Sequence, residues 1–148
     1  MVLLKELRLI ERKIMNNIGT MNILALAYLG DAIYEVYIRT FLLQKGIQKV
    51  NELQRQAKQF VSAKGQAGVL KELLDQQLLT EQEIDVVKRA RNHKSHKSPK
   101  NTDIVTYKQS TGLEALFGYL FLTHQTERIN ELMNRIVGEE ICMSMEKM

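Results

Sequence analysis

Apolar residues recur at helical spacing along most of this 148-residue chain. In the first segment Leu4, Leu7 and Ile10 repeat every three residues, which is typical of one face of an α-helix. The pattern predicts a helix over each of these segments: 3–15, 22–44, 50–61, 81–91, 105–123 and 126–142. Residues 62–77 either continue the third helix or form a separate one, because two glycines interrupt that stretch.

Short polar signals mark where several of these helices begin and end. Gly46 follows the second helix and is expected to end it. Thr80 and Glu83 fit a capping box, in which each side chain accepts a hydrogen bond from a free backbone N–H. Thr126 is expected to cap the last helix. Residues 92–103 hold too few apolar side chains to be buried, so they are predicted to form an exposed loop.

The second helix carries apolar residues on most sides and is predicted to be the central, most buried helix. With one proline and eight glycines, the chain has few helix-breaking residues, which favours helices over a sandwich or barrel. The predicted fold class is all-α, a single-domain helical bundle. Residues 1–20 are interpreted as an N-terminal helix, 21–142 as the body of the domain, and 143–148 as a frayed end.

The composition favours a soluble cytoplasmic protein. A single cysteine cannot form an internal disulfide, so nothing indicates secretion. The charged first residues are not followed by an apolar stretch that would serve as a signal peptide. Residues 14–30 lack charge before Asp31, but polar residues interrupt them, and they are not expected to span a membrane.

The positive charge is concentrated in one segment. The net charge is +4, and residues 88–100 contain basic side chains and no acid. The basic residues of this segment are Lys88, Arg89, Arg91, Lys94, Lys97 and Lys100. The segment predicts a polyanionic partner, with a solvated loop that binds nothing as the alternative. His93 and His96 have a His-x-x-His spacing but no further ligands nearby, so they are interpreted as loop residues rather than a zinc site.

Two acids interrupt the two most apolar helices. Asp31 and Glu114 stand where an unpaired carboxylate would be costly to bury. Gly30 precedes the first acid and Gly118 follows the second by four residues. If the helices cross closely at these glycines, the two carboxylates face one site. From the residues alone, a shared functional site and its alternative are equally favoured. In the alternative, each acid lies at a solvent-facing gap or in an ion pair.

A pair of carboxylates suits a hard divalent cation. Mg²⁺ in proteins typically takes one or two carboxylates and completes its octahedron with water and substrate phosphate. Such an ion polarises phosphoryl oxygens and acidifies water, which is the chemistry of phosphodiester hydrolysis. This chemistry needs no histidine or cysteine.

Two segments resemble hallmark motifs of the ribonuclease III catalytic domain: Leu29-Gly30-Asp31 and Glu114-Ala115-Leu116-Phe117-Gly118. The match is closer still to the short branch of that family, Mini-ribonuclease III. It extends through further segments at 26–37, 61–64, 88–92, 98–103 and 110–122. The resemblance therefore covers most of the chain from 24 to 122.

The resemblance implies a helical endonuclease domain that acts as a homodimer. It implies Mg²⁺-dependent endoribonuclease activity on double-stranded RNA, yielding 5′-phosphomonoesters, and a role in maturation of the 23S ribosomal RNA precursor. Asp31 and Glu114 would be the catalytic and metal-binding residues, and the basic segment would bind RNA. No small-molecule cofactor, membrane partner or appended double-stranded-RNA-binding domain is expected.

The chain departs from larger family members at two positions. Ala27 and Thr111 stand where those members carry acids, so fewer protein ligands and more metal-bound water are expected. Glu35, one turn beyond Asp31, is a candidate outer-shell substitute, with a solvated face as the favoured alternative. The missing acids motivate a competing hypothesis, a catalytically inactive RNA-binding or ribosome-assembly factor. A third hypothesis is a helical interaction protein that binds no nucleic acid.

Overall fold

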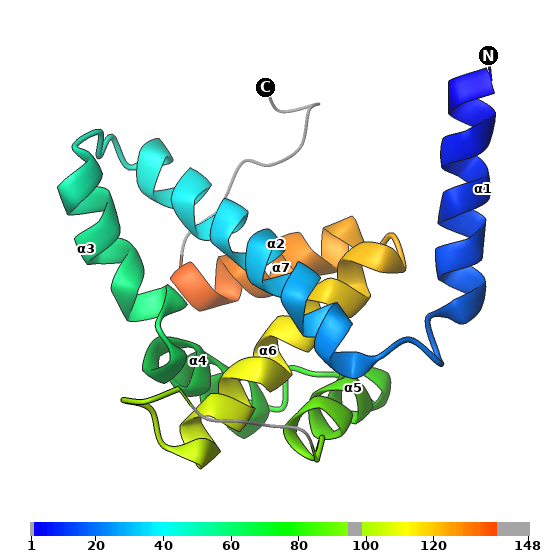
Figure 1. Cartoon of the computed structure of the whole chain (residues 1–148). Helices are drawn as coiled ribbons and strands as arrows, with labels where there is room; N and C mark the ends of the chain where they lie inside the picture. The colour runs from blue at the N-terminus through cyan, green and yellow to red at the C-terminus, as the bar shows by residue number, and fades with distance from the viewer. Residues whose placement is uncertain (1, 95–98, 139–148) are drawn as a thin grey trace.

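The computed structural model describes residues 2–94 and 99–138, and within these ranges the chain forms α-helices and no strand. The all-α prediction is thereby confirmed (Figure 1). The helices are α1 (Val2–Asn17), α2 (Ile23–Gln44), α3 (Val50–Val61), α4 (Ala63–Asp75), α5 (Glu81–Arg91), α6 (Ile104–Leu122) and α7 (Thr126–Val137).

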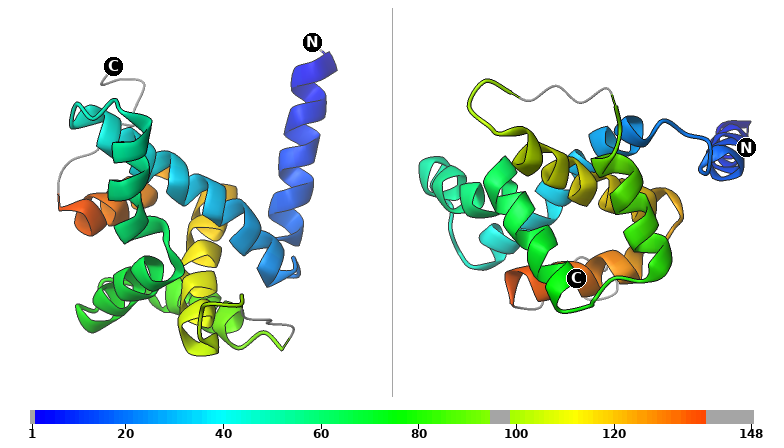
Figure 2. Two further views of the ribbon diagram at one scale, coloured as in Figure 1. Left: turned by 60° about the vertical axis from the view of Figure 1, so that its left-hand side comes forward. Right: turned by 90° about the horizontal axis from the view of Figure 1, so that it is seen from below.

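Helix α6 is the centre of the bundle. It packs against α2, α4, α5 and α7, and the views of Figures 1 and 2 show these helices arranged around it. The prediction that the second helix is the central one was wrong. The outer face of α2 is apolar yet open, with Tyr28 76%, Val36 50% and Leu43 55% exposed. Both helices are apolar on most sides, so their composition alone could not show which one other helices surround.

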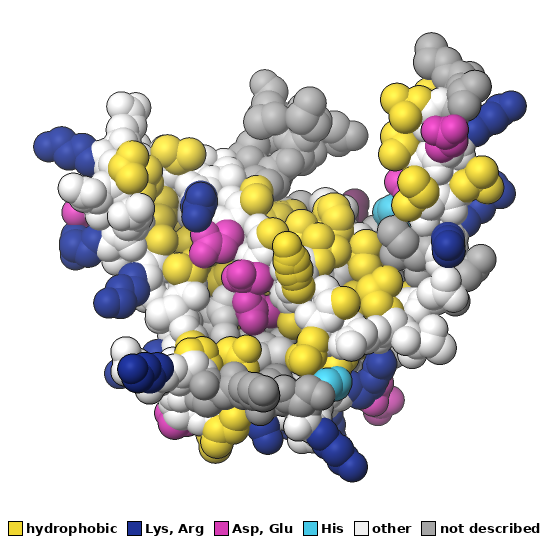
Figure 3. Space-filling model, in the orientation of Figure 1, with side chains coloured by type: hydrophobic (Ala, Val, Ile, Leu, Met, Phe, Trp, Pro, Cys, Tyr) yellow, Lys and Arg dark blue, Asp and Glu magenta, His cyan; other side chains and the backbone are white. Residues whose placement is uncertain are grey.

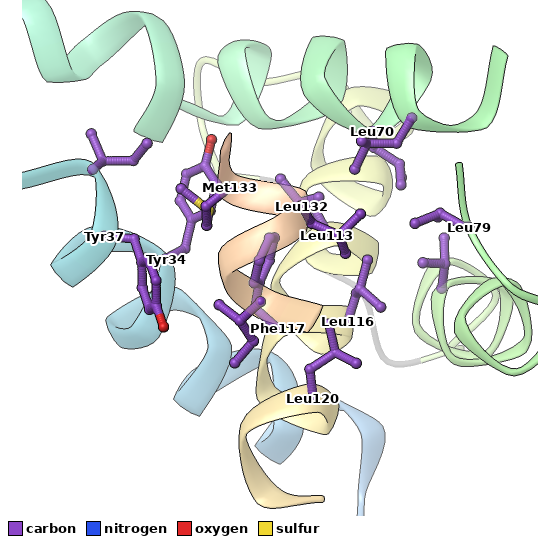
Figure 4. Packing of buried hydrophobic residues seen from close by; sticks show 14 of the residues in the cluster. Tyr34, Tyr37, Leu70, Leu79, Leu113, Leu116, Phe117, Leu120, Leu132 and Met133 are labelled. Carbon is purple, nitrogen blue, oxygen red and sulfur yellow. The ribbon is translucent and has the colours of Figure 1, made fainter. Parts of the chain in front are cut away.

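The main core lies where α2, α4, α6 and α7 meet. Leu113, Leu116 and Phe117 of α6 are fully buried there (Figure 4). The ring of Tyr34 lies 5.5 Å from that of Phe117, and its hydroxyl donates a hydrogen bond of 2.9 Å to the Phe60 carbonyl. Burial of these large side chains supplies the main driving force for assembling the bundle.

The polar signals at most helix ends act as predicted. Gly46 follows the end of α2 with φ +90°. Ser62 separates α3 from α4, and its hydroxyl accepts a 3.0 Å hydrogen bond from the Gly65 amide. Most of residues 62–77 thus form a separate helix, α4, rather than continuing α3. Thr80 and Glu83 form the capping box at the start of α5.

Both ends of α7 differ from the prediction. Thr126 is the first helical residue, and Gln125, which makes no capping hydrogen bond through its side chain, precedes it. The helix ends at Val137 because Gly138 adopts φ +74°, a left-handed conformation that stops an α-helix. The predicted helix end near residue 142 and the predicted frayed segment 143–148 lie outside the described residues.

A buried ion pair joins α7 to α5. The Arg128 guanidinium binds both carboxylate oxygens of Glu83, at 2.9 and 2.8 Å, and donates a further 2.6 Å hydrogen bond to the Leu78 carbonyl. The side chains are 20% and 4% exposed, so the pair is largely shielded from water. The bidentate geometry fixes the packing of α7 against the start of α5.

Helix α1 stands away from the bundle. Figures 1 and 2 show it projecting from the body. Its apolar residues are 48–66% exposed at Leu3, Leu4, Leu7, Leu9 and Ile10. No helix within residues 2–94 and 99–138 combines the length and the apolarity that crossing a bilayer requires.

Candidate functional site

The close crossing of α2 and α6 places the two acids together. A Cβ atom on Gly30 would lie 2.6 Å from the Glu114 carbonyl carbon and 2.7 Å from the Gly118 amide nitrogen. A Cβ atom on Gly118 would lie 2.8 Å from the Leu26 carbonyl carbon. Only glycine permits this backbone-to-backbone contact. The close crossing at the two glycines, which the sequence analysis considered as a condition for a shared site, is therefore present in the structure.

Asp31 and Glu114 line the same cleft. The cleft has a volume of about 700 Å³ and lies beside the crossing of α2 and α6. Its lining includes Ala27, Tyr28, Asp31, Tyr107, Thr111 and Glu114. Asp31 is exposed to solvent and Glu114 is partly buried. On the face drawn in Figure 3, acidic side chains gather near the middle, and most of the clearly visible basic side chains lie toward the edge.

The two carboxyl groups interact directly. The pKa of Glu114 is raised to about 8, chiefly by burial and also by a hydrogen bond to Asp31 and by the charge of Asp31. The Gln66 amide opposes this rise. In the metal-free protein at neutral pH, Glu114 therefore holds a proton beside Asp31. None of the ion pairs among the described residues involves either acid, which rules out the ion-pair alternative for this part of the chain.

Gln66 of α4 is a polar neighbour of Glu114 that sequence reasoning missed. Its side chain is 2% exposed, and its Oε1 accepts a hydrogen bond from the Ser110 hydroxyl on α6. Its Nε2 has no hydrogen-bond partner among the described residues other than Glu114. One glutamine between Gly65 and Ala67 carries no signal in the sequence, because its burial depends on how α4 docks against α6.

The site fits a divalent cation that takes only a few of its ligands from the protein. Two carboxylates close enough to share a proton form a site where a cation can take the proton's place. Among the described residues no group of three or more histidine, cysteine, aspartate or glutamate side chains converges. Two carboxylates, with water and phosphate completing the shell, match the usual protein coordination of Mg²⁺.

The positions that depart from larger family members supply no further carboxylate. Ala27 is buried at 5% exposure, and the Thr111 hydroxyl donates a 3.0 Å hydrogen bond to the Tyr107 carbonyl. Glu35 does not replace them. Its carboxylate binds Arg39 at 2.8 Å, one turn along α2, so it is held in a surface ion pair instead.

The basic residues lie at the end of α5 and in the segment that follows. Lys88, Arg89, Lys94 and Lys100 are exposed. Arg91 is half-buried, with its Cγ packed beside Gly112 of α6, two residues before Glu114. The structure thus joins the basic end of α5 to the helix that carries one of the two acids. Lys97 and His96 lie outside the described residues.

The chain is similar to known ribonuclease proteins over most of its length. Residues 24–125 match the family model described as the Ribonuclease III domain. A Mini-ribonuclease 3 from Enterococcus faecalis is 51% identical over 84% of this chain and 97% of its own length. A Mini-ribonuclease 3 from Staphylococcus aureus is 44% identical over 82% of this chain and 91% of its own. A crystal structure of a protein from Fusobacterium nucleatum aligns with a TM-score of 0.71 and 34% identity, covering 82% of this chain and 96% of that one.

Proposed function

The chain belongs to the ribonuclease III family, in its Mini-ribonuclease 3 branch, and from this premise we propose that Asp31 and Glu114 are its catalytic carboxylates. The protein is an endoribonuclease that cleaves double-stranded RNA. The observation that carries the residue assignment is the meeting of the two carboxyl groups in one cleft at the crossing of α2 and α6.

The two acids lie at different depths in the cleft, and we assign them different roles on that basis. Asp31 is open to solvent and keeps its carboxylate available to a phosphate that enters the cleft. Glu114 lies deeper and carries a proton in the metal-free protein, so it becomes a ligand when that proton leaves. Together they would hold Mg²⁺, which supplies Lewis-acid polarisation of the phosphoryl group and acidification of nearby water. Thr111 and Ala27 line the cleft beside the two acids, at the positions where larger family members carry further carboxylates.

The basic residues are proposed to hold the RNA duplex. Lys88, Arg89, Arg91, Lys94, Lys97 and Lys100 would contact phosphates. A-form RNA is recognised mainly through its shape, its phosphates and its 2′-hydroxyls, and lysines and arginines on a surface segment suit that task. The attachment of Arg91 beside Gly112 brings this segment toward the helix that carries Glu114. The proposed substrate is the 23S ribosomal RNA precursor, cut by a homodimer in the cytoplasm.

The test is duplex cleavage by the purified protein with Mg²⁺. Wild type should cut a double-stranded RNA and leave 5′-phosphomonoester ends. Asp31→Asn and Glu114→Gln should keep the wild-type circular dichroism spectrum and slow cleavage about 1,000-fold, since each removes several kcal/mol of charge stabilisation in the transition state. Glu35→Gln is the matched control, because Glu35 lies on α2 but pairs with Arg39, and it should cleave at the wild-type rate.

Two results would reject the assignment. Turnover retained by Asp31→Asn would show that this acid is structural. A wild-type protein that binds duplex RNA but leaves it intact at every Mg²⁺ concentration would favour the inactive RNA-binding factor instead.

A further inference from the structure

We propose that Gln66 is a positioning residue that orients the Glu114 carboxylate for a divalent cation, with Ser110 fixing the orientation of the Gln66 amide. The inference rests on the proposed function and assigns a role in the site to α4, which contributes no acid to it. Its basis is a buried side chain with a polar atom that nothing else in the fold uses.

The surroundings determine which way the Gln66 amide points. Its Oε1 accepts the hydrogen bond from the Ser110 hydroxyl, and its Nε2 has no partner among the residues described other than Glu114, to which the Gln66 side chain hydrogen-bonds. The neighbouring group that the amide affects is Glu114, whose ionised form only accepts hydrogen bonds. The NH₂ end of the amide must therefore serve the carboxylate side. Ser110 is itself 5% exposed, so water does not compete for this bond.

An unsatisfied buried N–H group is costly, typically by about 1–3 kcal/mol, so the Gln66 amide needs an acceptor. Glu114 is that acceptor, because the hydrogen bond of the Gln66 side chain to it favours the ionised carboxylate. A hydrogen bond from Nε2 to one carboxylate oxygen then restricts the rotation of the Glu114 side chain. It leaves the other oxygen free to face the cleft shared with Asp31. Groups that orient metal ligands in this way commonly change metal affinity by about 10- to 100-fold.

The competing interpretation is purely structural. The Gln66–Ser110 pair also joins α4 to α6 within the core, so its loss would lower stability whatever happens at the acids. The two interpretations differ in metal affinity. A structural pair changes the melting temperature alone, whereas a positioning residue changes the affinity of the folded protein for a divalent cation.

The experiment measures Mn²⁺ binding to the RNA-free full chain by electron paramagnetic resonance of free Mn²⁺, beside the Mg²⁺ concentration for half-maximal duplex cleavage. Gln66→Met keeps the length of the side chain but removes the amide. We expect it to raise the Mn²⁺ dissociation constant and the half-maximal Mg²⁺ concentration about tenfold. Ser110→Ala keeps the amide but frees it to turn, so it should shift both values in the same direction by a smaller factor.

Gln109→Met is the matched control. Gln109 precedes Ser110 on α6 and has a buried amide atom without a partner, its Oε1, among the described residues. Unlike Gln66, Gln109 is not among the groups that act on Glu114, so its substitution should leave Mn²⁺ affinity within about twofold of wild type.

Unchanged Mn²⁺ affinity in folded Gln66→Met would overturn the inference. If that variant does not fold, unchanged affinity in Ser110→Ala would overturn it as well. The proposed function fails separately, when wild type binds Mn²⁺ yet leaves duplex RNA uncut. In that case a weaker Mn²⁺ affinity of Gln66→Met would still support the role of Gln66 in metal binding.

Discussion

Glu114 differs from an ordinary surface glutamate because its side chain is enclosed on one side and faces Asp31 on the other. Both effects act against its ionised form, and burial is the larger of the two. A divalent cation held between the two carboxyl groups, as proposed above, would reverse this balance by adding positive charge. The same two residues would then favour a proton in the metal-free protein and a cation when metal is present.

The raised pKa of Glu114 predicts how stability changes with pH in the absence of metal. An acid whose pKa is higher in the folded state than in the unfolded chain stabilises the fold while it stays protonated in both. That contribution is fully present below the ordinary glutamate pKa of 4.5 and is lost as pH rises toward about 8. The free energy of unfolding in EDTA should therefore fall over this range more steeply for wild type than for Glu114→Gln.

Urea unfolding of both proteins at pH 5, 7 and 9 measures this difference. Comparison with the variant cancels the histidines and other groups that titrate in the same range. If the difference in the free energy of unfolding between the two proteins is the same at all three pH values, the pKa of Glu114 is not raised in the folded state.

For single residues, the sequence predicted the two acids but not the polar side chains that lie beside them. Asp31 and Glu114 were predicted because a carboxylate in an apolar helix is conspicuous and because two motifs resemble a known family. Gln66 and Ser110 were not predicted, since a glutamine or serine is ordinary at either place until the docking of α4 buries it. The ion pair of Glu35 with Arg39 likewise depended on which way that side chain turns.

Among the helices, the crossing of α2 and α6 is the contact that sets the geometry of the site. The carbonyl carbon of Glu114 is one of the atoms closest to Gly30, so the backbone contact and the position of the acid are the same feature. Anything that separates the helices also moves the carboxylates apart.

Gly30→Ala should destabilise the protein by about 3 kcal/mol or more, because the added methyl group meets backbone atoms that cannot turn aside. Gly68→Ala provides the contrast. Gly68 is exposed within α4 and has open space around its Cα, so alanine there should stabilise the fold by about 0.5–1 kcal/mol. Thermal melting of the two variants measures both effects, and an equal response to the two substitutions would argue against a close crossing at Gly30.

The helices themselves followed closely from the spacing of apolar residues, and the errors arose at their ends and in their order of burial. The capping box at Thr80 was predicted because it depends on residues three positions apart. The end of α7 was not, since the left-handed conformation of Gly138 depends on the backbone there rather than on the apolar pattern. The central place of α6 depends on tertiary contacts that no single helix reveals.

For the whole molecule, the distribution of charge governs the encounter with RNA. Alanine at Lys94, Lys97 and Lys100 should weaken duplex binding and reduce the slope of log affinity against log salt concentration by up to about 2–3, because each lost phosphate contact removes about 0.7–0.9. A matched control neutralises three exposed lysines elsewhere on the surface: Lys45, Lys49 and Lys58. Fluorescence anisotropy across a salt series compares the two sets, and equal slopes would reject the assigned RNA-binding segment.

The separation of α1 from the bundle predicts that the bundle folds without it. Deletion of residues 1–17 should change the free energy of unfolding by no more than about 0.5 kcal/mol, because the exposed leucines of α1 bury little surface against the body and Ile18, which packs against the core, is kept. Chemical denaturation of the shortened chain measures this, and a loss of several kcal/mol would show that α1 supports the fold. The apolar pattern predicted the helix correctly but could not show that its apolar face stays open.

The proton held between Glu114 and Asp31 has a thermodynamic consequence for titrations with metal salts. A cation that enters near neutral pH must displace it, so each binding event delivers a proton to the buffer. The apparent heat measured by calorimetry will therefore include the buffer's own enthalpy of protonation and will differ between Tris and HEPES. Above about pH 9 the carboxyl group is already ionised, and the two buffers should give the same heat.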